Sequence, residues 1–171
     1  MKKLLAILLL TSIAFSAIAQ DAEQISKILE KDHVNYMDFS YLIATELGMN
    51  VSPFEAWAYC DRFESFPFTA KPTDKIPVKM ISFFLMKNYS LPGGIMWSLT
   101  QSPRYAWKEL RNNSFWSVSV DPSSAISGRN MIQAISKFFI LWPTATLMDP
   151  PRTEVKSEYI NALLSEKEDT L

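Results

Sequence analysis

Ser52-Pro53-Phe54-Glu55-Ala56-Trp57 decides the fold, because a similar stretch, Ser102-Pro103-Arg104-Tyr105-Ala106-Trp107, follows it at an offset of 50 residues. Each stretch opens with a serine, which caps helices well, and continues with a proline at the first helical position. In the first stretch, Glu55 is placed to complete a capping box with Ser52. Both stretches therefore predict helix starts, and their likeness predicts a repeated helical unit.

The same offset continues along the chain after each of these helix starts. The matched pairs are Pro72 with Pro122, Ile76 with Ile126, and Lys79 with Arg129. The unit consists of a capped helix with Ala-Trp, an irregular loop and an apolar helix, and the second unit carries an insertion around Gly93-Gly94. Repeated helix pairs bury a continuous core by stacking on one another, which suits a binding or scaffolding protein.

Hydrophobic spacing predicts further helices elsewhere in the chain. They cover residues 21–34, 38–47, 77–89, 95–100, a segment that starts near 127, and 153–168. Asp38 is the predicted cap of the second of these helices, and Gly48 its stop. Only residues 115–120 alternate as a strand would, and briefly. The sequence predicts an all-α helical bundle with short irregular loops and little or no sheet.

The two ends of the chain are predicted to lie outside this repeat domain. Lys2 and Lys3, an apolar run and Ala17-Ile18-Ala19 predict a signal peptide at residues 1–19. The repeat domain then covers 20–142, a proline-rich loop 143–152, and a C-terminal amphipathic helix and tail 153–171. No later window is apolar enough for a transmembrane helix. We expect an exported protein of the periplasm or cell envelope.

Composition excludes several function classes. Without Lys2 and Lys3 the chain has 15 basic and 18 acidic residues, a balance of −3 that offers no footprint for nucleic acid. A single Cys and a single His make a zinc site or a disulfide framework implausible, and no cofactor motif is present. We expect Cys60 to be a buried small hydrophobe and His33 a surface residue.

The repeat resembles the S-layer homology module. Residues 102–107 look like the aromatic-Ala helix of that family, and residues 121–129 look like its loop and second helix start, with Gly128 where the family has Arg and Arg129 one place later. The likeness covers residues 38–141. Residues 93–106 are also similar in style to exported spirochaete envelope proteins with Gly-Gly followed by Pro-Arg-Tyr-Ala. The resemblance implies a helical bundle of S-layer-homology-like repeats that holds wall polysaccharide.

Binding of polysaccharide or peptidoglycan needs aromatic faces for sugar rings and cations for acidic groups. The candidates are Lys79, Arg104, Tyr105, Trp116 and Arg129. We therefore expect a non-catalytic protein, without cofactor or metal, whose partner is a cell-wall polymer or an envelope protein.

Two alternatives remain open at this stage. The apolar stripe of the last predicted helix, formed by Val155, Tyr159, Ile160, Leu163 and Leu164, could dock on an envelope complex. A cell-wall hydrolase would need paired carboxylates, for which the sequence offers Glu55, Asp61, Glu64 and Glu109.

Overall fold

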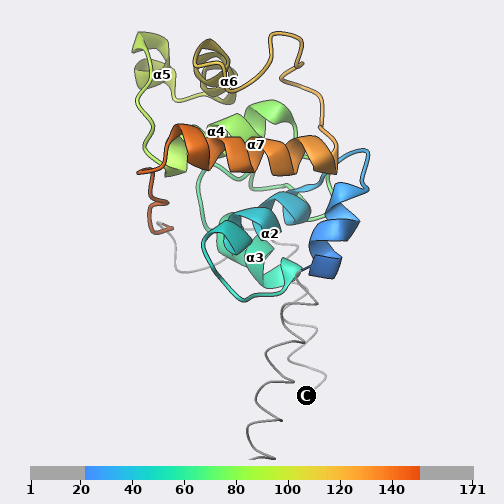
Figure 1. The fold of residues 1–171 in the computed structure, drawn as a ribbon. Coiled ribbons are helices and arrows are strands. Elements are labelled where there is room, and N and C mark those ends of the chain that lie inside the picture. The colour runs from blue at the N-terminus through green and yellow to red at the C-terminus, as the bar shows by residue number, and fades with distance from the viewer. Residues whose placement is uncertain (1–21, 151–171) are drawn as a thin grey trace, which may run out of the picture.

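The described part of the protein, residues 22–150 of a computed structural model, consists of helices and loops without a sheet (Figure 1). A helix at 22–29 is followed by α2 (Tyr36–Glu46), α3 (Pro53–Asp61), α4 (Val78–Asn88), α5 (Ile95–Thr100), α6 (Pro103–Asn112) and α7 (Gly128–Leu141). Residues 115–120 form turns, and one isolated bridge joins Asn35 to Lys75. The predicted all-α class is confirmed for these residues.

The helix starts α3 and α6 lie where the two similar stretches predict them. In α3 the Oγ of Ser52 accepts the Glu55 N–H at 3.3 Å, and the Glu55 carboxylate accepts the Ser52 N–H at 2.7 Å. This capping box is the predicted one. Ser102 makes no side-chain cap bond, and Tyr105 at the third position has no carboxylate that could accept the Ser102 N–H.

The cap of α2 differs from the prediction. Asn35, not Asp38, is the N-cap residue, and its side chain accepts the Asp38 N–H at 2.8 Å. The buried Asp38 carboxylate returns a bond to the Asn35 N–H and accepts two from the Lys31 ammonium, at 2.7 and 2.9 Å. The acidic residue is thus the third residue of the capping box. At the other end, Gly48 has a φ of +70° and follows the last turn as predicted.

The first helix is shorter than the predicted span 21–34. The helical residues end at 29, and the backbone beyond them bonds to a distant part of the chain. The Lys31 carbonyl accepts the Gly128 N–H at 2.9 Å, and the Val34 N–H donates to the Ile126 carbonyl at 3.0 Å. Because these groups are used between segments, they are not available to continue the helix.

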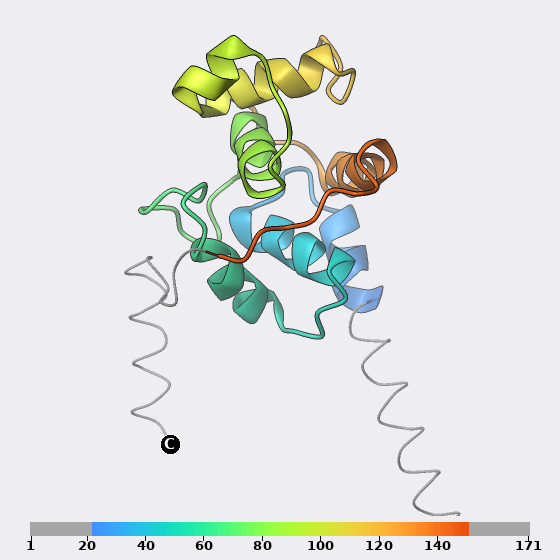
Figure 2. The same ribbon diagram turned by 90° about the vertical axis from the view of Figure 1, so that its left-hand side faces the viewer.

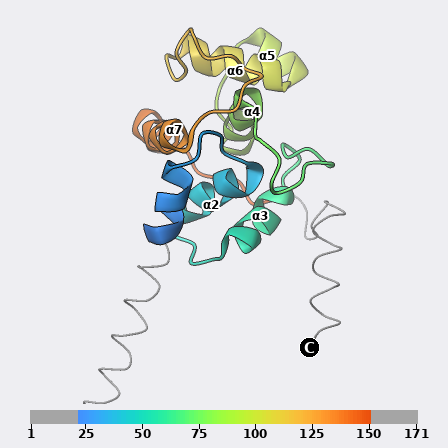
Figure 3. The same ribbon diagram turned by 90° about the vertical axis from the view of Figure 1, so that its right-hand side faces the viewer.

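Three helices start in the same way, in a cyclic arrangement. The first N–H of α2, α4 and α7 donates to a loop that leads to another of these three helices. The bonds run from Tyr36 to Asp74 at 3.1 Å, from Val78 to Ser124 at 2.9 Å, and from Gly128 to Lys31 at 2.9 Å. Figure 3 shows the three helices grouped around a common centre, and the buried side chains of Val34, Ile76 and Ile126 precede their starts.

Each of these inner helices has an outer neighbour. α3 packs on α2, and α6 packs on α4, while the helix at 22–29 approaches the start of α7. α5 and α6 form an outer layer above α4 (Figure 2). Edge-to-face aromatic contacts fill the interior, including Phe39 on Phe84 at 5.1 Å and Tyr89 on Phe138 at 4.9 Å.

Some predicted features fall on residues that the structure does not describe. The signal peptide at 1–19 and the C-terminal helix at 153–168 lie outside the described residues 22–150. Between 22 and 150 no helix combines the length and hydropathy that a membrane crossing needs. Cys60 is buried and His33 is exposed, and both positions confirm the predictions.

Candidate functional site

A cleft of about 220 Å³ lies between α6, the start of α4 and the loop before α7. Its lining includes the cationic side chains of Lys79, Arg104 and Lys108, together with Trp107. This volume lies below the ~300 Å³ of a typical small-molecule site, so the cleft suits one ring or one acidic substituent of a larger ligand. Lys79 and Arg104 are two of the candidates from the sequence.

Backbone hydrogen bonds fix the loop that forms one wall of this cleft. The N–H of Lys79, the second residue of α4, donates to the Pro122 carbonyl at 2.9 Å, and the N–H of Val78 donates to Ser124. Within the loop, the Asp121 carboxylate accepts the Ser123 N–H at 2.8 Å. The loop that carries Pro122 and Ser123 is therefore held against α4 beside Lys79.

α6 supplies the opposite wall. Ala106 and Leu110 are buried beneath the helix, and the spacing of Arg104 and Lys108, four residues apart, places both cations on one face. The ammonium of Lys108 lies 5.0 Å from the ring centre of Tyr105. Both lysine and tyrosine are half-buried, so this cation–π contact orients the lysine side chain at the rim.

None of the three cations of the cleft forms an ion pair within residues 22–150. Ion pairs elsewhere in that part of the chain include Glu23–Lys27, Asp38–Lys31 and Glu64–Lys87. Cations that line one cleft repel one another unless a negative charge is supplied. The arrangement therefore favours an anionic ligand.

Trp107 lines the cleft and has a buried indole N–H. The ring is 8% exposed, and its buried indole N–H has no hydrogen-bond partner within residues 22–150. The guanidinium of Arg111 lies 4.5 Å from the ring centre. The indole N–H of Trp57, the matching residue of α3, is also buried and has no partner among residues 22–150, so the unpaired donor is shared by both Ala-Trp helices.

The residues at the corresponding positions beside α3 are uncharged. Met37 is the second residue of α2, and its N–H donates to the Pro72 carbonyl at 3.0 Å, as that of Lys79 does to Pro122. At the 50-residue offset, the two cations of α6 correspond to Phe54 and Ala58. The same backbone arrangement therefore forms without cations beside α3, so the fold does not require the cations beside α6.

The remaining candidates from the sequence lie elsewhere. Trp116 is buried, and its indole N–H donates to the Ser82 hydroxyl at 2.8 Å, so the side chain connects the loop after α6 to α4. Arg129 is exposed near the start of α7 and does not line the cleft. Sequence reasoning missed Trp107 and Lys108, although the spacing of Lys108 from Arg104 is a signal that could have found it.

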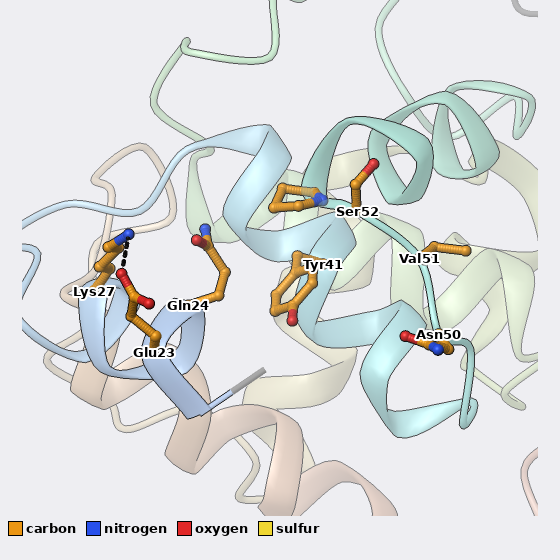
Figure 4. Close-up of a pocket in the computed structure, with 8 residues that line it drawn as sticks. Glu23, Gln24, Lys27, Tyr41, Asn50, Val51 and Ser52 are labelled. Atoms are coloured by element: carbon orange, nitrogen blue, oxygen red, sulfur yellow. Dashed lines mark ion pairs between the residues drawn. The ribbon is translucent and has the colours of Figure 1, made fainter. Parts of the chain in front are cut away.

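A second cavity, of about 310 Å³, lies between the helix at 22–29, α2 and the loop before α3 (Figure 4). In Figure 4 Tyr41 lies between Gln24 and Ser52, and Lys27 is paired with Glu23 at 2.8 Å. The charges at its rim are thus balanced, and the lysine and glutamate side chains of this pair are mostly exposed. This cavity has no concentration of unpaired charge comparable to the cleft.

Several of the carboxylates that a hydrolase would need are held by contacts within the fold. Glu55 belongs to the capping box of α3, and Glu64 accepts the Lys87 ammonium at 3.0 Å. Asp61 is buried, and the carboxylate of Glu109 lies against Gly94. Among residues 22–150 there is no group of three or more His, Cys, Asp or Glu side chains that could hold a metal ion.

Comparison with protein-family models, with curated proteins and with solved structures gave no match to this chain.

Proposed function

We propose that this protein is a non-catalytic cell-envelope protein that binds an acidic cell-wall polysaccharide through the cleft of Lys79, Arg104, Trp107 and Lys108. The observation that carries the proposal is the set of three cations without acidic partners in residues 22–150, beside a buried tryptophan with an unused N–H. Carboxylate or phosphate groups on a sugar supply the missing charge, and the small exposed part of Trp107 supplies an apolar contact.

The predicted signal peptide and the likeness to S-layer homology repeats support this choice of ligand. Two features of the fold agree with a repeat. The starts of α3 and α6, and those of α4 and α7, are each separated by 50 residues. The backbone bonds that anchor α2 and α4 to the following loops correspond residue by residue. In this proposal, the polymer binds where Lys79 of the first unit meets Arg104, Trp107 and Lys108 of the second.

Retention on insoluble sacculi from the producing bacterium tests the proposal. The Lys79→Gln/Arg104→Gln variant is expected to lose at least tenfold in affinity, because each charge-assisted contact contributes about 1.5–3 kcal/mol. The single variants Arg104→Gln and Arg129→Gln are the matched pair, since each removes one exposed cation and only Arg104 lines the cleft. Raising the salt concentration should weaken the retention of the parent protein on the sacculi, because salt screens the attraction between cations and acidic groups.

Unchanged retention of the Lys79→Gln/Arg104→Gln variant, with its circular dichroism preserved, would overturn the proposal. An equal loss in Arg129→Gln would show general attraction to charge and would also contradict a defined site. The same incubations show whether soluble fragments are released from the sacculi, which would indicate a hydrolase instead.

A further inference from the structure

The outer layer of α5 and α6 exposes apolar side chains in an unusual concentration. Ile95 is 79% exposed and Leu99 75%, and Met96 beside them is 45% exposed. They occupy three of the six positions of α5, whose only buried residue is Trp97. Scattered single hydrophobic residues are normal on a protein surface, but a cluster of this kind marks a contact surface.

This cluster belongs to an element that the rest of the fold holds in place. Trp97 packs edge-to-face on Phe83 of α4, with ring centres 6.2 Å apart. A side chain at Gly93 would overlap the Trp97 ring, and one at Gly94 would stand 3.0 Å from the Glu109 carboxylate of α6. α5 is therefore anchored on both sides, and its other face presents the apolar side chains outward.

The segment that carries the cluster is also positively charged. Residues 95–112 contain Arg104, Lys108 and Arg111 against Glu109 alone, a balance of +2 in a chain whose total is −1. α5 and α6 lie side by side in the same outer layer (Figures 1 and 2). The layer that exposes the apolar side chains therefore carries a net positive charge.

From the exposed apolar cluster of α5 and the net positive charge of the α5–α6 layer, we propose that this layer docks on the surface of an anionic lipid bilayer, with Ile95, Met96 and Leu99 inserted among the headgroups. Apolar side chains beside basic ones are the pattern that binds such surfaces, because insertion removes apolar area from water while lipid phosphates attract the cations. A bilayer also accepts side chains that project from an outer layer, whereas a protein partner would have to supply a matching groove.

Co-sedimentation with vesicles tests the docking. The protein used is the chain from residue 20 to residue 171, which includes every described residue. The vesicles contain phosphatidylcholine with about 30% phosphatidylglycerol, which makes their surface anionic. The Ile95→Asn/Leu99→Asn variant should bind at least tenfold more weakly. Arg111→Gln, which lies outside the polysaccharide cleft, should weaken binding about fivefold.

Ile140→Asn is the matched control. Ile140 is 76% exposed on α7, outside the layer, so the same substitution there should leave vesicle binding unchanged. Because all three isoleucine and leucine side chains are exposed, the variants should keep the parent's circular dichroism and Tm. Vesicles of phosphatidylcholine alone should bind more weakly than anionic ones.

Three results would overturn the proposal. They are absence of parent binding to anionic vesicles, equal binding by the α5 variant and Ile140→Asn, and equal binding to neutral and anionic vesicles. If the α5 variant instead changes the sedimentation coefficient of the protein alone, the surface joins two copies of the chain. The test is separate from the polysaccharide proposal, since Lys79→Gln should reduce retention on sacculi without changing vesicle binding.

Discussion

Gly128 lies against the carbonyl group of Ile28, so closely that a β-carbon at this glycine would overlap the carbonyl oxygen. The same β-carbon would stand 3.1 Å from the Cα of Leu29, and the Gly128 N–H donates to the Lys31 carbonyl. This contact joins the first described helix to the last one and completes the cyclic arrangement of α2, α4 and α7. The absence of a side chain is what permits it.

Gly128→Ala should therefore destabilise the fold. Backbone atoms move less easily than side chains, so we expect a loss of about 1–3 kcal/mol in the free energy of unfolding. Thermal unfolding followed by circular dichroism measures it. Gly48→Asn is the control, because Gly48 has open space around it and asparagine tolerates its positive φ. Equal stability of Gly128→Ala and the parent would contradict the close approach.

Trp116 should act through stability and not through ligand binding. Its N–H donates to the Ser82 hydroxyl, which in turn donates to the Val78 carbonyl at 2.8 Å. Trp116→Phe leaves this buried hydroxyl without its donor and should cost about 1–3 kcal/mol. Urea unfolding of Trp116→Phe, Ser82→Ala and the double variant should give a coupling of about 1 kcal/mol. Additive losses, or reduced retention of Trp116→Phe on sacculi, would show another role.

Cys60 should be inert in the folded protein. Burial raises the pKa of its thiol to about 12, so the reactive thiolate is scarce at pH 8. We expect labelling by a thiol reagent to be at least about a thousandfold slower than in the protein unfolded with guanidinium, given three pKa units and the lack of access. Reaction of the native protein within minutes, at the rate of the unfolded chain, would contradict this burial.

Tyr89 should lower stability at alkaline pH. Burial raises the pKa of its phenol, whose hydroxyl has no hydrogen-bond partner within residues 22–150. Above the ordinary pKa of 10 the unfolded chain ionises while the folded one does not, so stability falls as pH rises. Tyr89→Phe removes this effect.

The measurement is urea unfolding of the parent and Tyr89→Phe at pH 7 and at pH 10.5. At pH 7 the variant should be as stable as the parent or up to about 1 kcal/mol more stable, because no buried hydroxyl is left unpaired. At pH 10.5 the difference should grow in favour of the variant. An unchanged difference between the two pH values would mean that Tyr89 does not keep its proton in the folded state.

The residues that set helix starts explain how far the sequence could predict the fold. Ser52, Pro53 and Glu55 interact within a few residues of one another, so their capping box follows from local chemistry alone. Asp38 shows where local reasoning was wrong. It suits a cap position, but the Asn35 side chain is also able to cap, and the buried pairing with Lys31 favours Asp38 inside the first turn.

Two of the candidate binding residues that the sequence offers lie together in the cleft. The need of a polysaccharide site for cations makes Lys79 and Arg104 candidates, and both line the cleft. Arg129, a candidate for the same reason, lies outside it. Lys79 differs from Arg129 because the loop with Pro122 and Ser123 packs on the start of α4. Pro122 and Ser123 are carried to Lys79 by backbone hydrogen bonds across more than 40 residues, and no local pattern reports such a pairing.

The sequence by itself determined the helices, their order and several of their ends, because capping, proline position and hydrophobic spacing act over a few residues. The tertiary structure alone decided that the Ile28 carbonyl meets Gly128, that Trp116 bonds to Ser82, and that the cations of α4 and α6 share one cleft. These contacts join segments distant in sequence, and they depend on how the helices pack around the common core.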